Sequence, residues 1–337
     1  MTDANPSDQK ASDRLVERIE PKLADLKKEL EANRRSAIRR LAVTAAVTVA
    51  AAIAVSIVMT LTLDTGASML GIVPIFIGGV VIIRMILRQQ EQWRAQVAGA
   101  LLPRICEQFE GDMEYQAEAD RNFVKPYTAL DLVGRWTSGE VQHLIRGKYR
   151  GRQFEMVYAH LRAGSNRQGA GQVFQGLLLR IQTMASFEPG LSIRPNFGLF
   201  VKAFGKRAVP TGDEKFDSLF LVSPDDNSKL DTEQLNRLFP PEWQQALLAI
   251  HEDLGPVPIS GQSRLSAGAK YDALYLAIGL EELGPMRSLR SRPFPDAGNV
   301  LTGSSALPEM VRKTVDDVLV GPRAIDRLPE VGTNPVD

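Results

Sequence analysis

The residues able to perform chemistry are few and widely separated in this sequence. The chain has three histidines, His143, His160 and His251, and a single cysteine, Cys106. One thiol cannot form an internal disulfide, and so few Cys and His side chains cannot supply the ligand set of a zinc site. We therefore expect no resident metal, and a disulfide-built extracellular domain is excluded.

Motifs for nucleophilic catalysis or phosphate binding are also missing. The sequence has no G-x-S-x-G and no H-E-x-x-H, and its glycine-rich stretch at 163–172 lacks the Gly-Lys-Ser/Thr ending of a P-loop. Carboxylates pair at Asp225-Asp226 and Glu281-Glu282, but turn and capping roles explain the first pair. We expect neither a catalytic residue nor a cofactor, which favours a non-enzymatic function.

A basic run offers the clearest candidate for binding. Arg146, Lys148, Arg150 and Arg152 recur at every second residue, which points to contact with anionic lipid headgroups. A hairpin exposed to water is the simpler interpretation of the same pattern. Because Lys+Arg and Asp+Glu both total 40, no global basic field exists, and no nucleic acid is expected as a partner.

Two apolar stretches near the N-terminus predict a transmembrane hairpin over residues 41–88. Residues 41–63 carry no charge, and at 1.5 Å per residue such a helix exceeds the roughly 30 Å hydrocarbon core. Residues 69–87 contain a single charged residue, Arg84, which lies near the end of the span. Small residues at Ala46, Ala50 and Ala54 would allow the hairpin to pack on itself or to form a homo-oligomer.

Basic residues around the hairpin predict its orientation. Arg39 and Arg40 precede the first span, and Arg84 and Arg88 close the second, whereas the connection holds only an aspartate. Because basic flanks stay in the cytoplasm, both termini are predicted to be cytoplasmic in a bacterial inner membrane. Trp93 follows the second span at a distance that suits the membrane interface.

The remaining segments read as an α+β protein. We expect an amphipathic cytoplasmic helix over 1–40, a juxtamembrane helix over 89–117, a mostly β cytoplasmic domain over 118–285, and a largely irregular tail over 286–337 with one short helix at 308–320. A helix capped by Asp231 or Thr232 is predicted to run through Leu238, and a second helix, with Pro240-Pro241 in its first turn, is predicted to run to Leu254. Strands are predicted at 141–145, 153–161, 173–183, 191–193, 198–203, 219–222, 262–266 and 271–278.

Several short stretches resemble a bacterial two-transmembrane family of unknown function (domain of unknown function 3137). They are RGRQFE at 150–155, FQGLL at 174–178, FLVSPD at 220–225 and a Leu-x-x-x-Phe-Pro stretch at 235–240. The resemblance covers roughly 90–280 and implies a cytoplasmic domain behind two spans. Since the family carries no established activity, it implies no site residues.

The function that these observations favour is a membrane protein presenting a cytoplasmic binding or scaffolding domain. A membrane-anchored enzyme with an unrecognised site is the first alternative. A structural subunit of a membrane complex, held through the hairpin, is the second.

Overall fold

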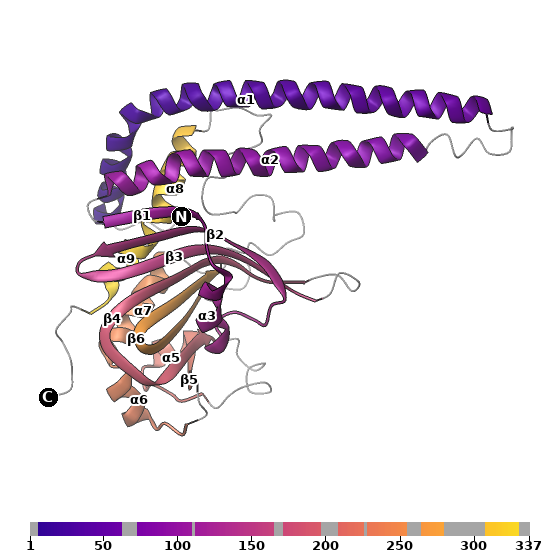
Figure 1. The fold of residues 1–337 in the computed structure, drawn as a ribbon. Helices are drawn as coiled ribbons and strands as arrows, with labels where there is room; N and C mark the ends of the chain where they lie inside the picture. The colour runs from indigo at the N-terminus through magenta and orange to yellow at the C-terminus, as the bar shows by residue number, and fades with distance from the viewer. Residues whose placement is uncertain are drawn as a thin grey trace. The chain divides into compact units, whose positions relative to one another are not determined.

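The structure is a computed structural model of the 337-residue chain, and it describes residues 6–62, 73–109, 112–164, 171–196, 208–225, 228–254, 264–279 and 307–329. The chain divides into two compact units, which are described separately. One unit contains most of two long helices, Glu17–Leu101, and the other contains an antiparallel β-sheet with its covering helices (Figure 1). The α+β class is therefore confirmed.

The helical unit is formed by α1 (Pro6–Thr62) and α2 (Val73–Gln108), which run side by side in opposite directions (Figure 1). The helices approach closely at Gly78, where an added Cβ would lie 3.2 Å from Ala52 Cβ and 3.9 Å from Thr48 Cγ2. Within α1, the Thr44 and Thr48 hydroxyls donate to backbone carbonyls four residues earlier, each at 2.8 Å. Both hydroxyls are thus satisfied inside an apolar helix.

Large apolar side chains cover the outside of this helix pair. Leu61 is 81% exposed and Phe76 72% exposed, which is the opposite of a core helix in a soluble protein. Both helices are long and apolar enough to cross a membrane, with 0% and 6% of their apolar windows buried. The other large exposed apolar residues of the pair are Val43, Val47, Val49, Ile53, Val55, Ile57, Val58, Val73, Ile75, Ile77, Val80, Val81, Ile83 and Leu87.

The second helix ends earlier than the predicted juxtamembrane helix over 89–117. Helix α2 stops at Gln108, and β1 (Asp112–Glu118) follows it. The prediction was wrong here because the helical stripe was extended too far. In the sequence DMEYQAE, polar and less polar residues alternate with period two, which is a strand pattern.

Within the described residues, the sheet has six strands, in the order β1-β2-β3-β4-β5, with β6 also pairing with β4. The strands after β1 are β2 (Ser138–Tyr149), β3 (Arg152–Ala163), β4 (Gly171–Pro195), β5 (Phe220–Pro224) and β6 (Leu265–Gly279). All pairs are antiparallel. Two predicted strands, 173–183 and 191–193, are one long strand β4, and the predicted strand at 198–203 lies outside the described residues.

Both faces of the sheet carry apolar cores. On one face, Val157, Ala159 and Leu178 pack with Tyr127 and Leu130, which come from the short α3 (Lys125–Ala129) and the turn after it. That helix follows the 3-10 turn η2 (Arg121–Val124), whose Asp120 cap accepts from Asn122. Apolar cover is therefore present on only part of this face.

The other face is covered by helices that the chain supplies before and after β5. They include α5 (Glu214–Leu219), α6 (Thr232–Leu238) and α7 (Pro241–Leu254), and the predictions for α6 and α7 are confirmed. The Trp243 ring meets Phe187 of β4 edge-on, with centroids 5.4 Å apart.

The C-terminal region is more ordered than predicted. It contains α8 (Leu307–Val318) and a second helix, α9 (Val320–Arg327). A Cβ on Gly321 would lie 2.9 Å from the Phe154 ring of β3, so α9 packs closely on the sheet. The sequence pattern missed α9 because its apolar positions are few. Contact with the sheet buries them, with Ile325 3% exposed.

Candidate functional site

A row of alternating charges crosses the open part of the α3-side face. Cross-strand register aligns Glu114 of β1, Arg146 of β2, Glu155 of β3 and Arg180 of β4. Directly paired residues of antiparallel strands share a face, so these four side chains lie in one line. Glu155 accepts from Arg146 Nε at 2.8 Å and lies 3.5 Å from Arg180 Nη1.

A second, parallel row lies two residues further along the strands. Asp112 of β1 aligns with Lys148 of β2, which aligns with Gln153 of β3. Gln182 of β4 donates to Asp272 of β6 at 3.3 Å. These two rows line a groove of about 640 Å³, within the range of ligand-binding clefts.

The hairpin turn between β2 and β3 sets this alignment. Arg150 and Gly151 form the turn with φ values of 46° and 79°, as the tight two-residue turns of hairpins require. Tyr149 therefore pairs with Arg152, and counting back from the turn places Arg146 opposite Glu155. The turn also fixes which face each residue of the basic run occupies.

The four basic residues predicted to touch lipid are consequently not brought together. Arg146 and Lys148 lie on the groove face, whereas Arg150 lies at the turn, with Nε 2.9 Å from Asp326 Oδ1 of α9. Arg152 is 7% exposed on the opposite side, where its guanidinium donates to the Pro329 carbonyl. Burial lowers the pKa of Arg152. Lipid contact by the run stays a prediction. Arg146, Lys148 and Arg150 are exposed, but only Arg146 and Lys148 lie in the groove.

The ion pairs of the groove are partly solvated. The Arg146 side chain is 48% exposed and that of Glu155 27% exposed, so each pair contributes at most about 1 kcal/mol to folding. The groove therefore has charges that are arranged by the sheet but are not sealed from water. A polar partner can therefore compete for these side chains at little cost to the stability of the fold, because the ion pairs that it would replace stabilise the fold only weakly.

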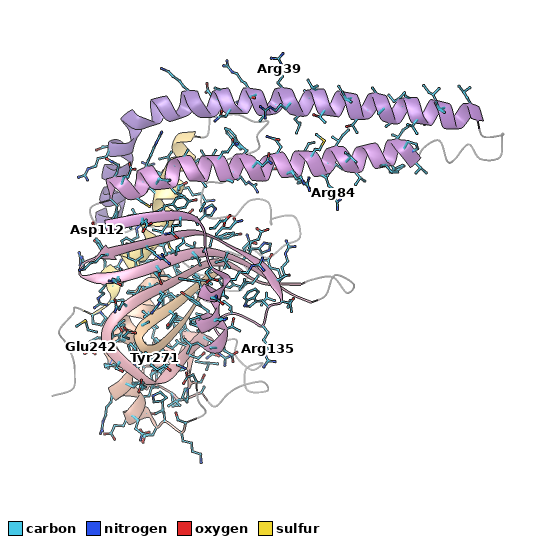
Figure 2. The ribbon with its side chains drawn as sticks, in the orientation of Figure 1. Arg39, Arg84, Asp112, Arg135, Glu242 and Tyr271 are labelled. Atoms are coloured by element: carbon cyan, nitrogen blue, oxygen red, sulfur yellow. The ribbon has the colours of Figure 1, made fainter. Side chains whose placement is uncertain are left out.

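The predicted membrane-interface residues lie in the helical unit. Arg39 and Arg84 come from different helices and lie on the same side of the apolar stretch, away from the connection between the helices (Figure 2). Arg40 and Arg88 are exposed as well. Trp93 differs from an exposed interfacial anchor, because only 6% of it is exposed.

A histidine that the sequence left without a role connects β1 to β2. His143 sits at a bulge with φ 57°, and its Nδ1 lies 3.0 Å from the Tyr115 hydroxyl oxygen. Burial lowers the pKa of His143 to about 4 and raises the pKa of Tyr115 to about 12. Both groups are therefore neutral at pH 7, and the contact holds the edge strand in place without acid–base chemistry.

The other candidate chemical groups have structural surroundings. His251 packs edge-on against Phe220, and burial lowers its pKa. Asp225 pairs with Lys270, whose Nζ lies 2.6 Å from Oδ2. In the part of the chain that the structure describes, no group of three or more His, Cys, Asp or Glu side chains is placed to hold a metal ion. Asp226, Glu281 and Glu282 fall outside that part.

Sequence reasoning missed the acidic half of the groove. Asp112 and Glu114 belong to β1, which was predicted to be the end of a helix. The alternation of polar and less polar residues that indicates a strand was therefore not recognised. The signal was available as acids at 112, 114 and 118 on one side of a period-two pattern.

Comparisons with known proteins assign no family to the chain. No family model matches it, and no curated protein matches it. Among solved structures, the crystal structure of the mycobacterial trehalose monomycolate transport factor A, TtfA, aligns over 73% of this chain and 99% of that chain, with 9% identity and a TM-score of 0.29. A likeness at that level transfers neither fold nor function, and the resemblance to the family of unknown function stays a prediction.

Proposed function

We propose that this chain is a two-span inner-membrane protein that presents a non-catalytic binding domain to the cytoplasm. The observation that carries the proposal is the polar groove, in which Arg146, Glu155 and Arg180 are aligned by three strands and remain accessible to water. A binding surface needs only such an arrangement of exposed complementary groups. A scaffolding role uses the same surface.

Membrane insertion is supported by the exposed apolar surface of the helix pair. Side chains such as Val47 (62% exposed), Leu61 and Phe76 would be costly to leave in water over this length. A bilayer removes that cost, and the hydrogen-bonded helices leave no backbone group unsatisfied in lipid. Arg39 and Arg84 lie partway along the two helices, toward the end of the apolar stretches that is away from residues 63–72 (Figure 2), which supports a cytoplasmic position for both termini.

Reporter fusions test the topology. A phosphatase that is active only outside the cytoplasm should be active when inserted into the 63–72 connection and inactive at the C-terminus. The reverse pattern would show that the domain faces outward, and activity at neither position would contradict a two-span hairpin.

Site-specific crosslinking tests the binding role. Gln153 lies in the groove, and Glu242 is exposed on α7 away from β1 (Figure 2). A photo-reactive amino acid at Gln153 of the full chain, in native membranes, should give a discrete protein adduct that the same amino acid at Glu242 does not give. No adduct, or identical adducts from both positions, would contradict a binding role for the groove.

A further inference from the structure

The charge row that crosses the sheet ends on an acid at the edge strand. From β4 to β1 the signs alternate as Arg180, Glu155, Arg146 and Glu114. The second row ends in the same way, with Lys148 followed by Asp112. Both rows therefore stop at a carboxylate, and a further strand in the same sheet would have to supply cations to continue them.

Strand β1 is the outermost strand of the sheet (Figure 1). Among the residues that the structure describes, it pairs with β2 and with no other strand. Its Asp112, Glu114, Gln116 and Glu118 side chains share one face and are exposed. An edge strand of this kind can accept an extended segment through its free backbone groups.

We propose that β1 and the adjoining groove bind an extended basic peptide segment of a partner protein, which adds to the sheet beside β1. The proposal rests on the binding role proposed above and names the partner of that site. Lys or Arg at alternate positions of the segment would stand beside Asp112 and Glu114. Opposite charges in directly facing cross-strand positions are favourable, and like charges are not.

The same charges disfavour a second copy of this chain as the occupant. Two β1 strands paired antiparallel would place the acids of one strand against those of the other. Every polar position of β1 on this face is an acid or Gln116, so no register of such a pair brings a cation opposite Glu114. The edge is therefore selective for a basic segment over self-association.

Reversing the charges of the edge strand and of the peptide tests the proposal. The full chain in detergent would be titrated with a seven-residue peptide alternating Lys and Thr, and with the same peptide carrying Glu in place of Lys. The Lys peptide should bind more tightly, with an affinity that falls as salt rises. Asp112→Lys combined with Glu114→Lys should weaken that binding by about tenfold and create binding of the Glu peptide.

Two controls keep the result interpretable. Glu242→Lys makes the same charge change on an exposed position of α7, and it should leave both affinities unchanged. Asp112→Asn with Glu114→Gln keeps the shape of the edge strand. It should weaken binding of the Lys peptide without strengthening binding of the Glu peptide. Hydrogen exchange should slow at β1 amides when the Lys peptide binds.

Equal binding of the two peptides, no binding of either, or affinities that ignore the charge reversal would overturn the basic-segment proposal. The crosslinking experiment at Gln153 separates this failure from failure of the binding role. An adduct at Gln153 without peptide discrimination would leave the groove as a binding site for a different partner. Absence of both would remove the binding role itself.

Discussion

Arg146 and Glu155 face each other across the β2–β3 hairpin, with Nε 2.8 Å from Oε1, and the second oxygen of the same carboxylate lies 3.5 Å from Arg180. One acid thus serves two cations from neighbouring strands. Arg146, one of the four basic residues predicted to contact lipid, is therefore already paired with an acid of the sheet. Lys148 lies in the same groove, where its partner on β3 is Gln153 and its partner on β1 is Asp112.

Lys148 faces one acid across the strands, whereas Arg146 faces both Glu114 and Glu155. Of these two cations, we therefore expect Lys148 to contribute more to any contact of the groove with anionic headgroups. We expect a fluorophore at Gln153 of the full chain to be quenched more by headgroup quenchers in anionic nanodiscs than in neutral ones. Lys148→Gln should reduce the difference, since one exposed cation near an anionic surface is worth about 1 kcal/mol. Arg152→Gln is unsuitable as a control because Arg152 is buried, so Lys313→Gln, at an exposed position of α8, serves instead. Equal quenching in both lipids would exclude the contact.

The close approach of β4 and β6 makes a sharp prediction for folding. A Cβ on Gly176 would lie 2.0 Å from the Ile278 carbonyl oxygen, and a backbone atom cannot move aside cheaply. Gly176→Ala should lower the free energy of unfolding by roughly 2–4 kcal/mol. Gly171→Ala, in the same strand and with nothing within 4 Å of the added carbon, should change it by well under 1 kcal/mol. Urea unfolding in detergent, followed by tryptophan fluorescence, compares them; equal stabilities would contradict the packing.

The buried His143 makes stability depend on pH. Its folded pKa of about 4 lies below the usual 6.5, so the unfolded chain binds the proton more readily. Its contribution is therefore complete above pH 6.5 and is lost as the pH falls from 6.5 toward 4, by at most roughly 3 kcal/mol. Burial lowers the pKa of His251 too, which acts in the same direction.

The matched variant for this prediction is His143→Asn. Asparagine tolerates the positive φ at this bulge and does not titrate. Urea midpoints at pH 7 and pH 5 should differ less in the variant than in the parent chain. An unchanged difference would assign the pH dependence to other groups.

Much of the hairpin at the site could be predicted from sequence, whereas its neighbours could not. The pair Arg150-Gly151 predicts a tight turn. A two-residue turn at these positions is sufficient to align Arg146 with Glu155. Alignment with Arg180 depends on a register shift at Leu161/Arg162, which no local pattern encodes. The edge strand that carries Asp112 and Glu114 was not predicted, because the helical pattern that precedes it was extended over the same residues and they are too few to give a strong strand pattern. Helix α9 was missed because its cause is contact with Phe154, a non-local effect.

The helix pair offers a last test, in two adjacent glycines. An added Cβ at Gly78 would lie 3.2 Å from Ala52 Cβ, whereas Gly79 has nothing within 4 Å. Close packing of small residues is the main attraction between helices in lipid, since apolar burial gives none there. Gly78→Leu should separate α1 from α2 and lower the thermal midpoint of their helicity in detergent, by the equivalent of about 1–2 kcal/mol. Gly79→Leu places the same side chain toward open space and should leave the midpoint unchanged. Equal effects of the two substitutions would mean that the pair does not pack through Gly78.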